Sequence, residues 1–223
     1  EGSRRQGVLR HRRRRIIKRK VFIDCGANLG QSVMAFYSIF NNPEEFEIHS
    51  FEPSKLLKNS LVHNLKRFNN VSIHHKAAWI DNGGVLFDDQ GNESSSTEID
   101  KYSTRKSRML PFPSIDLSEF IKSYSEEDYV ILKVDIEGGE YKLFEHLEST
   151  GALRFIDEVY LELHAAKMHN TKIEQDFHLI DNLSKYGLQP RSWAAEKHLE
   201  KKVIGNVIDR EWVIYEWKRK RRL

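Results

Sequence analysis

Apolar runs and amphipathic segments alternate along the first half of the chain. The run KVFIDCG ends in an acid and a glycine, as a buried strand ends at a turn, and QSVMAFYSIF then has apolar spacing suited to a helix. A second run, EIHSFEP, precedes an amphipathic segment with helical spacing, SKLLKNSLVHNLKRF, and a third run, VSIHHKAAW, follows. Strand, helix, strand, helix, strand is typical of an α/β protein with a parallel sheet.

The alternation stops at residues 81–113, where polar residues, glycines and two prolines replace the apolar runs. We expect a hairpin near residues 84–88 and then a long loop. Loops of this size in a compact domain are usually functional or disordered. The polar, Ser-rich residues 89–110 therefore predict a mobile lid that orders when substrate binds.

The alternation resumes at residue 114. The predicted elements are a capped helix (SIDLSEFIKSY), a strand (YVILKVDIEG), a helix (GGEYKLFEHLES), a strand (DEVYLELH) and a helix (IEQDFHLIDNLSKYG). Two apolar-rich runs, KKVIGNVI and REWVIYEW, end the chain. A short polar turn joins them, which favours an antiparallel closing hairpin.

The composition excludes several classes of protein. Hydrophobic residues make up 39% of the 223 residues, which excludes global disorder. No apolar run approaches the roughly 18 residues of a membrane span. The single cysteine, Cys25, excludes an intrachain disulfide framework and a zinc site with several thiolates. No secretory signal is recognisable, so we expect a cytoplasmic location.

The charge is distributed unevenly along the chain. Residues 1–20 hold ten Lys or Arg and one acid, while the last nine residues hold five basic residues and one acid. Residues 21–214 keep 21 basic and 31 acidic residues, so the body is acidic and disfavours a nucleic-acid partner. We therefore divide the chain into a basic arm (1–19), a folded domain (20–217) and a basic tail (218–223). The arm is either a solvated tail or an electrostatic tether to a polyanion.

Two motifs indicate a nucleoside site. Asp24, Gly26, Asn28 and Gly30 belong to a predicted strand-to-helix turn, where glycines let the backbone approach a ligand and the helix offers free N–H groups. Glu52 ends the second predicted strand, where a carboxylate can accept both hydroxyl hydrogens of a ribose. Either motif alone fits a generic turn or a surface acid. Together they favour ribose binding.

Two further motifs carry ionisable groups at predicted strand ends. Lys133, Asp135 and Glu137 alternate with apolar residues in LKVDIEGGE, and Glu162 and His164 form a Glu-x-His pair after the next strand. In a parallel sheet, ligands bind outside the carboxyl ends of the strands. Charged groups there are costly to desolvate unless a ligand or a salt-bridge network uses them. These residues are therefore candidates for proton or metal chemistry.

Five blocks in order, VFIDCGANLGQS, SFEPS, KAAW, LKVDIEGGEYKLFEHL and LELH, resemble the FkbM family of S-adenosylmethionine-dependent methyltransferases. The resemblance covers roughly residues 20–165. It implies a Rossmann-like class I methyltransferase fold with a mostly parallel seven-stranded sheet and helices on both faces. It also implies O-methylation of a hydroxyl on a sugar, a glycan or a related small molecule.

The resemblance also assigns roles to single residues. The cofactor-binding residues would be Asp24, Gly26, Asn28, Gly30, Glu52, Ala78 and Trp79, and the catalytic residues Lys133, Asp135, Glu137, Glu162 and His164. Ala78 and Trp79 would lie near the adenine. Ser94, Ser95 and Ser96 stand where family members often carry a glycine-rich stretch, and they could also contact the cofactor.

Two mechanisms remain open for the predicted catalytic residues. Three carboxylates and one imidazole could bind a divalent cation, or one of them could act as general base. We favour the metal-free version, with Asp135 as base and His164 as second choice, because alternating carboxylates also suit the hydroxyls of a polyol. The competing hypothesis for the whole chain is a polyanion-binding module that uses its basic arms on an α/β scaffold.

Overall fold

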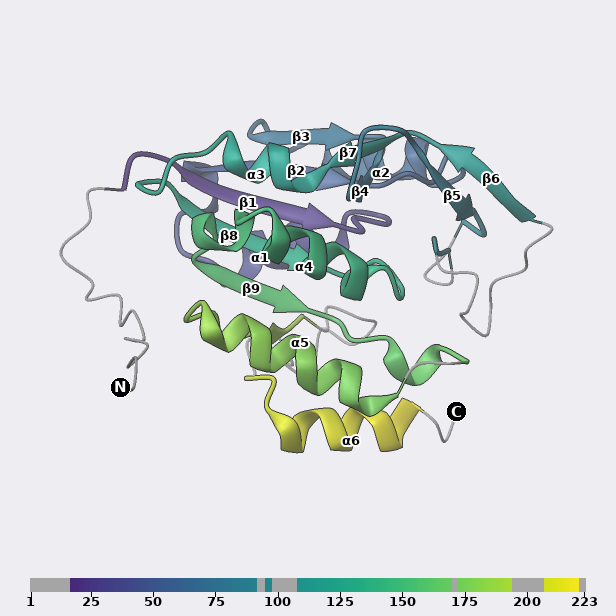
Figure 1. Ribbon diagram of the computed structural model, residues 1–223. Coiled ribbons are helices and arrows are strands. Elements are labelled where there is room, and N and C mark those ends of the chain that lie inside the picture. Colours follow the sequence, from purple (N-terminus) through teal and green to yellow (C-terminus); the bar gives the residue numbers. More distant parts are fainter. Residues whose placement is uncertain (1–16, 92–94, 98–107, 170–171, 194–206, 221–223) are drawn as a thin grey trace.

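A six-stranded sheet, parallel throughout, forms the centre of the protein (Figure 1). The computed structural model describes residues 17–91, 95–97, 108–169, 172–193 and 207–220. The strands, in spatial order, are β10 (Arg191–Ser192), β9 (Glu158–Leu161), β8 (Tyr129–Val134), β1 (Lys20–Cys25), β2 (Phe46–Phe51) and β3 (Val71–His74). The predicted parallel α/β fold is confirmed, whereas the seventh strand is missing from the described part of the sheet.

The chain runs outward from β1 through β2 to β3, and then returns to β8 on the other side of β1. The direction of winding therefore reverses between β1 and β8, where Asp24 pairs with Lys133 and Cys25 with Val134. A crevice opens at such a reversal, outside the carboxyl ends of the strands, and it is where α/β proteins of this kind bind ligands.

Helices cover both faces of the sheet. They are α1 (Gln31–Ile39), α2 (Lys58–Leu65), α3 (Leu117–Lys122), α4 (Glu140–Ser149), α5 (Ile173–Lys185) and α6 (Arg210–Lys220), with short 3₁₀ turns at Pro43–Glu45, Ala152–Phe155 and Ala165–Lys167. In β1, Val21 and Ile23 pack with α3, α4 and α5, while Phe22 faces the opposite side and packs with α1 and α2. Alternate residues of a strand point to opposite faces, so a strand buried on both sides is apolar throughout. None of the described helices is sufficiently long and apolar to cross a membrane.

The third predicted strand is two strands. β3 extends the main sheet, whereas β4 (Ala77–Trp79) leaves it and pairs in parallel with β7 (Ser114–Asp116). The expected helix from Ser114 therefore begins only after β7. Asp116 caps it by accepting hydrogen bonds from the backbone N–H groups of Ser118 and Glu119.

The hairpin expected near residues 84–88 has its second strand far along the chain. β5 (Val85–Asp88) pairs antiparallel with β6 (Met109–Phe112), so the predicted loop contributes a strand. This hairpin lies beyond the carboxyl ends of the central strands (Figure 1). Of the predicted lid, residues 92–94 and 98–107 lie outside the described residues, while Ser96 is buried and bridges to Asp88.

The predicted C-terminal hairpin is wrong, because its second half is the helix α6 (Figure 1). Asp209 accepts a hydrogen bond from the backbone N–H of Trp212 and so caps the helix, and Val213 packs into the core beside α5. Of the first half, residues 201–206 lie outside the described residues. Val207 forms one antiparallel bridge to Arg191.

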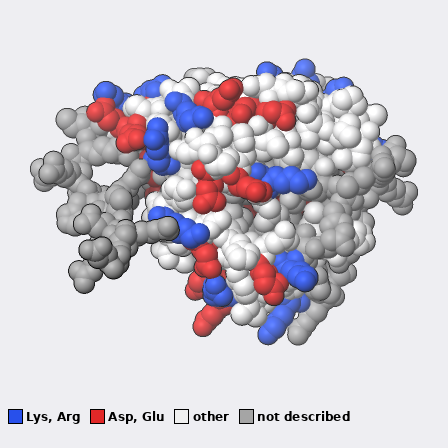
Figure 2. Space-filling view, in the orientation of Figure 1, with Lys and Arg blue, Asp and Glu red and all other residues white. Residues whose placement is uncertain are grey.

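Two residues of the basic arm form ion pairs with the loop before β8. Lys18 pairs with Glu127 at the surface, and Arg19 pairs with the buried carboxylate of Asp128 at 2.7 Å. Residues 1–16 lie outside the described residues. On the face in Figure 2, acidic and basic side chains are interspersed.

Replacing Asp128 by Asn is expected to lower the free energy of unfolding at pH 7 by about 1–3 kcal/mol, because a buried charge-assisted hydrogen bond is lost. The hydrogen bond from Arg19 holds the pKa of Asp128 at about 2, below its ordinary 3.8. A depressed pKa adds stability above the unfolded-state value, and this stability is lost as the pH falls toward 2. When unfolding is measured between pH 7 and pH 3, the free energies of unfolding of the native protein and of Asp128→Asn should therefore approach each other as the pH falls. Glu127→Gln, at the exposed pair, is the control and should change stability little.

Candidate active site

The turn from β1 to α1 brings its backbone against the end of β8. Gly26 has a φ of 85°, and a Cβ built there would lie 1.9 Å from the carbonyl oxygen of Asp135. Only glycine fits this close approach. Gly30, with a φ of 89°, precedes α1 and lies against Leu65, and Asn28 also has a positive φ of 50°.

Glu52 holds this turn from the neighbouring strand. One of its carboxylate oxygens accepts a hydrogen bond from the backbone N–H of Asn28 at 2.8 Å, and the other accepts from that of Ser54 at 2.9 Å. Burial raises the pKa of Glu52, while these two hydrogen bonds act in the opposite direction. The carboxylate is thus fixed in position, and its remaining lone pairs are available to ligand hydroxyls.

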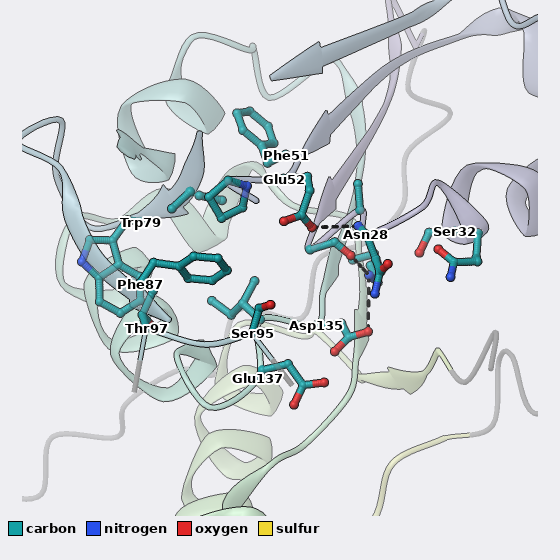
Figure 3. A pocket seen from close by; sticks show the side chains of 18 of the residues that line it. Asn28, Ser32, Phe51, Glu52, Trp79, Phe87, Ser95, Thr97, Asp135 and Glu137 are labelled. Atoms are coloured by element: carbon teal, nitrogen blue, oxygen red, sulfur yellow. Dashed lines mark hydrogen bonds and ion pairs between the residues drawn. The ribbon is translucent and has the colours of Figure 1, made fainter. Parts of the chain in front are cut away.

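A pocket opens at the winding reversal, with about 1070 Å³ of empty space, part of it open solvent (Figure 3). Phe51, Trp79 and Phe87 lie on one side of it, and Asn28, Ser32 and Asp135 on the other, with Glu52 between them. Its mixture of aromatic and polar walls suits a ligand that combines a flat ring with polar groups, such as a nucleoside.

Most of the predicted site residues line this pocket. They are Gly26, Asn28, Glu52, Ala78, Trp79, Lys133, Asp135 and Glu137. Asp24, Gly30, Glu162 and His164 are not among the lining residues. Asp24 lies beneath the turn, and the other three lie outside the pocket's walls.

Lys133 is a buried anchor for the turn. Its ammonium lies 3.1 Å from Asp24 Oδ1 and donates a hydrogen bond of 2.9 Å to the carbonyl oxygen of Gly26. Burial alone would lower the pKa of Lys133, but the carboxylates of Asp24 and Asp135 raise it. The side chain therefore stays charged and links β1 to β8 beneath the pocket.

The predicted cluster at the ends of β8 and β9 is assembled around His164. Its Nε2 lies 3.4 Å from Glu137 Oε2, 3.5 Å from Glu162 Oε1 and 3.7 Å from Asp135 Oδ1. Glu137 has a φ of 56°, a conformation that is strained for a residue with a side chain. Strain of this kind collects at functional sites, which supports a role for the cluster beyond packing.

Glu140, at the start of α4, orients His164 from the opposite side. Its Oε1 lies 3.1 Å from His164 Nδ1 and accepts the backbone N–H of His164 at 2.9 Å, and its Oε2 accepts the N–H of Gly138 at 2.8 Å. A carboxylate at Nδ1 keeps the proton on that nitrogen and turns Nε2 toward the cluster. Glu140 is not among the site residues predicted from the sequence, and an acid in the first turn of a helix is common for electrostatic reasons alone.

The cluster has perturbed acidities. Burial raises the pKa of Asp135 to about 7, although Lys133 opposes the change. Burial alone would lower the pKa of His164, but the carboxylates of Glu137 and Glu140 raise it well above its ordinary value. Such shifts in a cleft mark a candidate functional site.

Several residues that line the pocket were not predicted from the sequence. They include Phe87 on β5, Thr97, and Trp193 after β10. Ser95 lines the pocket, and Ser96 donates a hydrogen bond to the carbonyl oxygen of Glu137. Ser94 lies outside the described residues.

The fold and the site together define an α/β protein with a pocket at the winding reversal and a carboxylate–histidine cluster beside it. The model of the methyltransferase FkbM domain matches residues 24–190, about three quarters of the chain. The chain therefore belongs to the FkbM methyltransferase family, which confirms the resemblance. Searches of curated proteins and of solved structures found no match.

Proposed function

We propose that the protein transfers a methyl group from S-adenosylmethionine to a hydroxyl of a sugar, a glycan or a related small molecule. The observation that carries this proposal is the position of Glu52, whose fixed carboxylate faces the pocket between the glycine turn and Asp135. Membership of a methyltransferase family supports the reaction class. The acidic cluster supports a polyol acceptor, because carboxylates accept hydrogen bonds from hydroxyls.

The described residues fit the cofactor. Gly26 lets the turn pack against the end of β8, because a Cβ there would lie 1.9 Å from the carbonyl oxygen of Asp135, and Glu52 can accept the two ribose hydroxyls. Trp79 and Ala78 offer an apolar wall for a purine ring, with Phe87 nearby. When bound, S-adenosylmethionine supplies an electrophilic methyl group on a sulfonium.

The chain's own residues would position the acceptor and remove its proton. Transfer requires the acceptor oxygen about 3 Å from the methyl carbon and in line with the sulfur. Asp135 lines the pocket at the end of β8, so it is placed to take the hydroxyl proton, with His164 as the second candidate. Glu137, which also lines the pocket, would hold another hydroxyl. Lys133 would act by fixing the turn and Asp135 rather than by touching the acceptor.

Cofactor binding tests the proposal. S-adenosylmethionine should raise the Tm of the full chain, since a ligand at a hundredfold excess over its Kd adds ~2.7 kcal/mol of stability. Isothermal calorimetry should give one site for S-adenosylmethionine and for S-adenosylhomocysteine. If neither compound binds, the chain is not a methyltransferase of this kind.

A further inference from the structure

Three side chains of the cluster have the spacing of metal ligands. Asp135, Glu162 and His164 each offer one ligand atom, and these atoms lie within 4.8 Å of one another. His164 Nε2 is 3.5 Å from Glu162 Oε1 and 3.7 Å from Asp135 Oδ1. Two ligands at about 2.1 Å from one ion lie roughly 3.0–3.4 Å apart, so small side-chain movements would close the site.

The buried imidazole supplies a second, independent observation. His164 is fully buried, and its Nε2 has no hydrogen-bond partner among the described residues although it is aimed at the carboxylates. A buried polar nitrogen without a hydrogen-bond partner is unusual in a native fold, and a bound ion is one explanation of it. Glu140 at Nδ1 completes the arrangement in which a carboxylate orients a metal-binding histidine.

A protonated His164 held by the carboxylates is the competing explanation. An imidazolium would direct its Nε2–H at one oxygen, but the nearest oxygens lie at 3.4–3.7 Å, longer than the usual charge-assisted hydrogen bond. Four carboxylates surround His164 in the described part of the chain, while Lys133 and Lys167 are the nearby cations. A divalent ion would balance this charge, and Nε2 would release its proton when it binds the ion.

We propose that Asp135, Glu162 and His164 bind one divalent metal ion at the edge of the cofactor pocket. One imidazole and two carboxylates suit Mn²⁺ or Zn²⁺ better than Ca²⁺, which prefers oxygen ligands alone. Binding of the ion does not depend on the proposed function. The role of the ion does rest on the proposed function: the ion would polarise the acceptor hydroxyl and lower the pKa of that hydroxyl. In this version Asp135 is a metal ligand rather than the free general base of the metal-free mechanism, which is favoured on the sequence and used in the proposed function.

Mn²⁺ binding to the full chain, stripped of metal by a chelator, tests the site without cofactor or acceptor. The electron paramagnetic resonance signal of free Mn²⁺ falls as the ion binds, and it should give one bound ion per chain. Added Zn²⁺ should displace that ion. Glu162→Gln should weaken Mn²⁺ binding at least tenfold, and Glu140→Gln about 10–100-fold, as expected for a partner that orients a ligand. The control is Glu145→Gln, an exposed acid on α4 that should leave Mn²⁺ binding unchanged.

The proposal is overturned if neither Mn²⁺ nor Zn²⁺ binds, or if Glu162→Gln binds Mn²⁺ as tightly as the control does. Asp135→Asn provides a second ligand variant, and circular dichroism shows whether each variant folds. Failure of metal binding alone leaves cofactor binding to be measured by calorimetry, so it is distinguishable from failure of the proposed function. Success predicts in addition that excess chelator stops turnover and that Mn²⁺ restores it.

Discussion

Asp135→Asn should lower kcat by about two orders of magnitude or more while the Kd for S-adenosylmethionine stays near normal. The amide keeps the size of the side chain but cannot take a proton and is a weak metal ligand, so the loss is expected with or without an ion. His164→Ala should cause a loss of similar size. The measurement is the rate of S-adenosylhomocysteine formation with an acceptor found by screening sugars and glycans.

The matched control is Asp181→Asn, on the exposed surface of α5, where the carboxylate pairs with Arg210. It makes the same chemical change away from the pocket and should leave kcat unaltered. Calorimetry must show that Asp135→Asn still binds the cofactor, because only then does a lower kcat report on the chemical step. Normal turnover by Asp135→Asn would remove this residue from the reaction.

The sheet could be predicted because its strands are buried on both faces. KVFIDC and YVILKV are apolar over most of their length, and strands of this kind are satisfied by other strands beside them and by helices above and below. The C-terminal run REWVIYEW was misassigned because a short apolar run fits a strand or a buried helix equally well. The helix is stabilised by the capping side chain of Asp209 and by the packing of Val213. Neither can be read from the spacing of apolar residues in the sequence.

The candidate site was predictable where it depends on strand ends. Parallel neighbours finish at one edge of the sheet, which favours an approach of Asp135 after β8 to His164 after β9, and the two side chains lie 3.7 Å apart. Pocket residues that are placed by pairing with distant parts of the chain could not be predicted in this way. Phe87 reaches the pocket through the pairing of β5 with β6, and Trp193 follows a two-residue strand.

Glu52→Ala should weaken the binding of S-adenosylmethionine tenfold or more. The charge-assisted hydrogen bonds expected between this carboxylate and the ribose hydroxyls are each worth about 1.5–3 kcal/mol, and every 1.4 kcal/mol is about tenfold in Kd. The carboxylate also accepts the N–H groups of Asn28 and Ser54, so its loss leaves two donors without their acceptor and loosens the turn. Calorimetric titration of the variant with S-adenosylmethionine measures the effect.

Glu52→Gln separates these two contributions. The amide oxygen can still accept one N–H, while the NH₂ group faces the other donor, so the turn is only partly restored and the negative charge is gone. The Kd for the cofactor should therefore lie between those of the native protein and Glu52→Ala. Glu47→Ala, on the exposed side of the same strand, is the control and should bind normally. A native Kd in Glu52→Ala would mean that the ribose is held elsewhere and that Glu52 serves the turn alone.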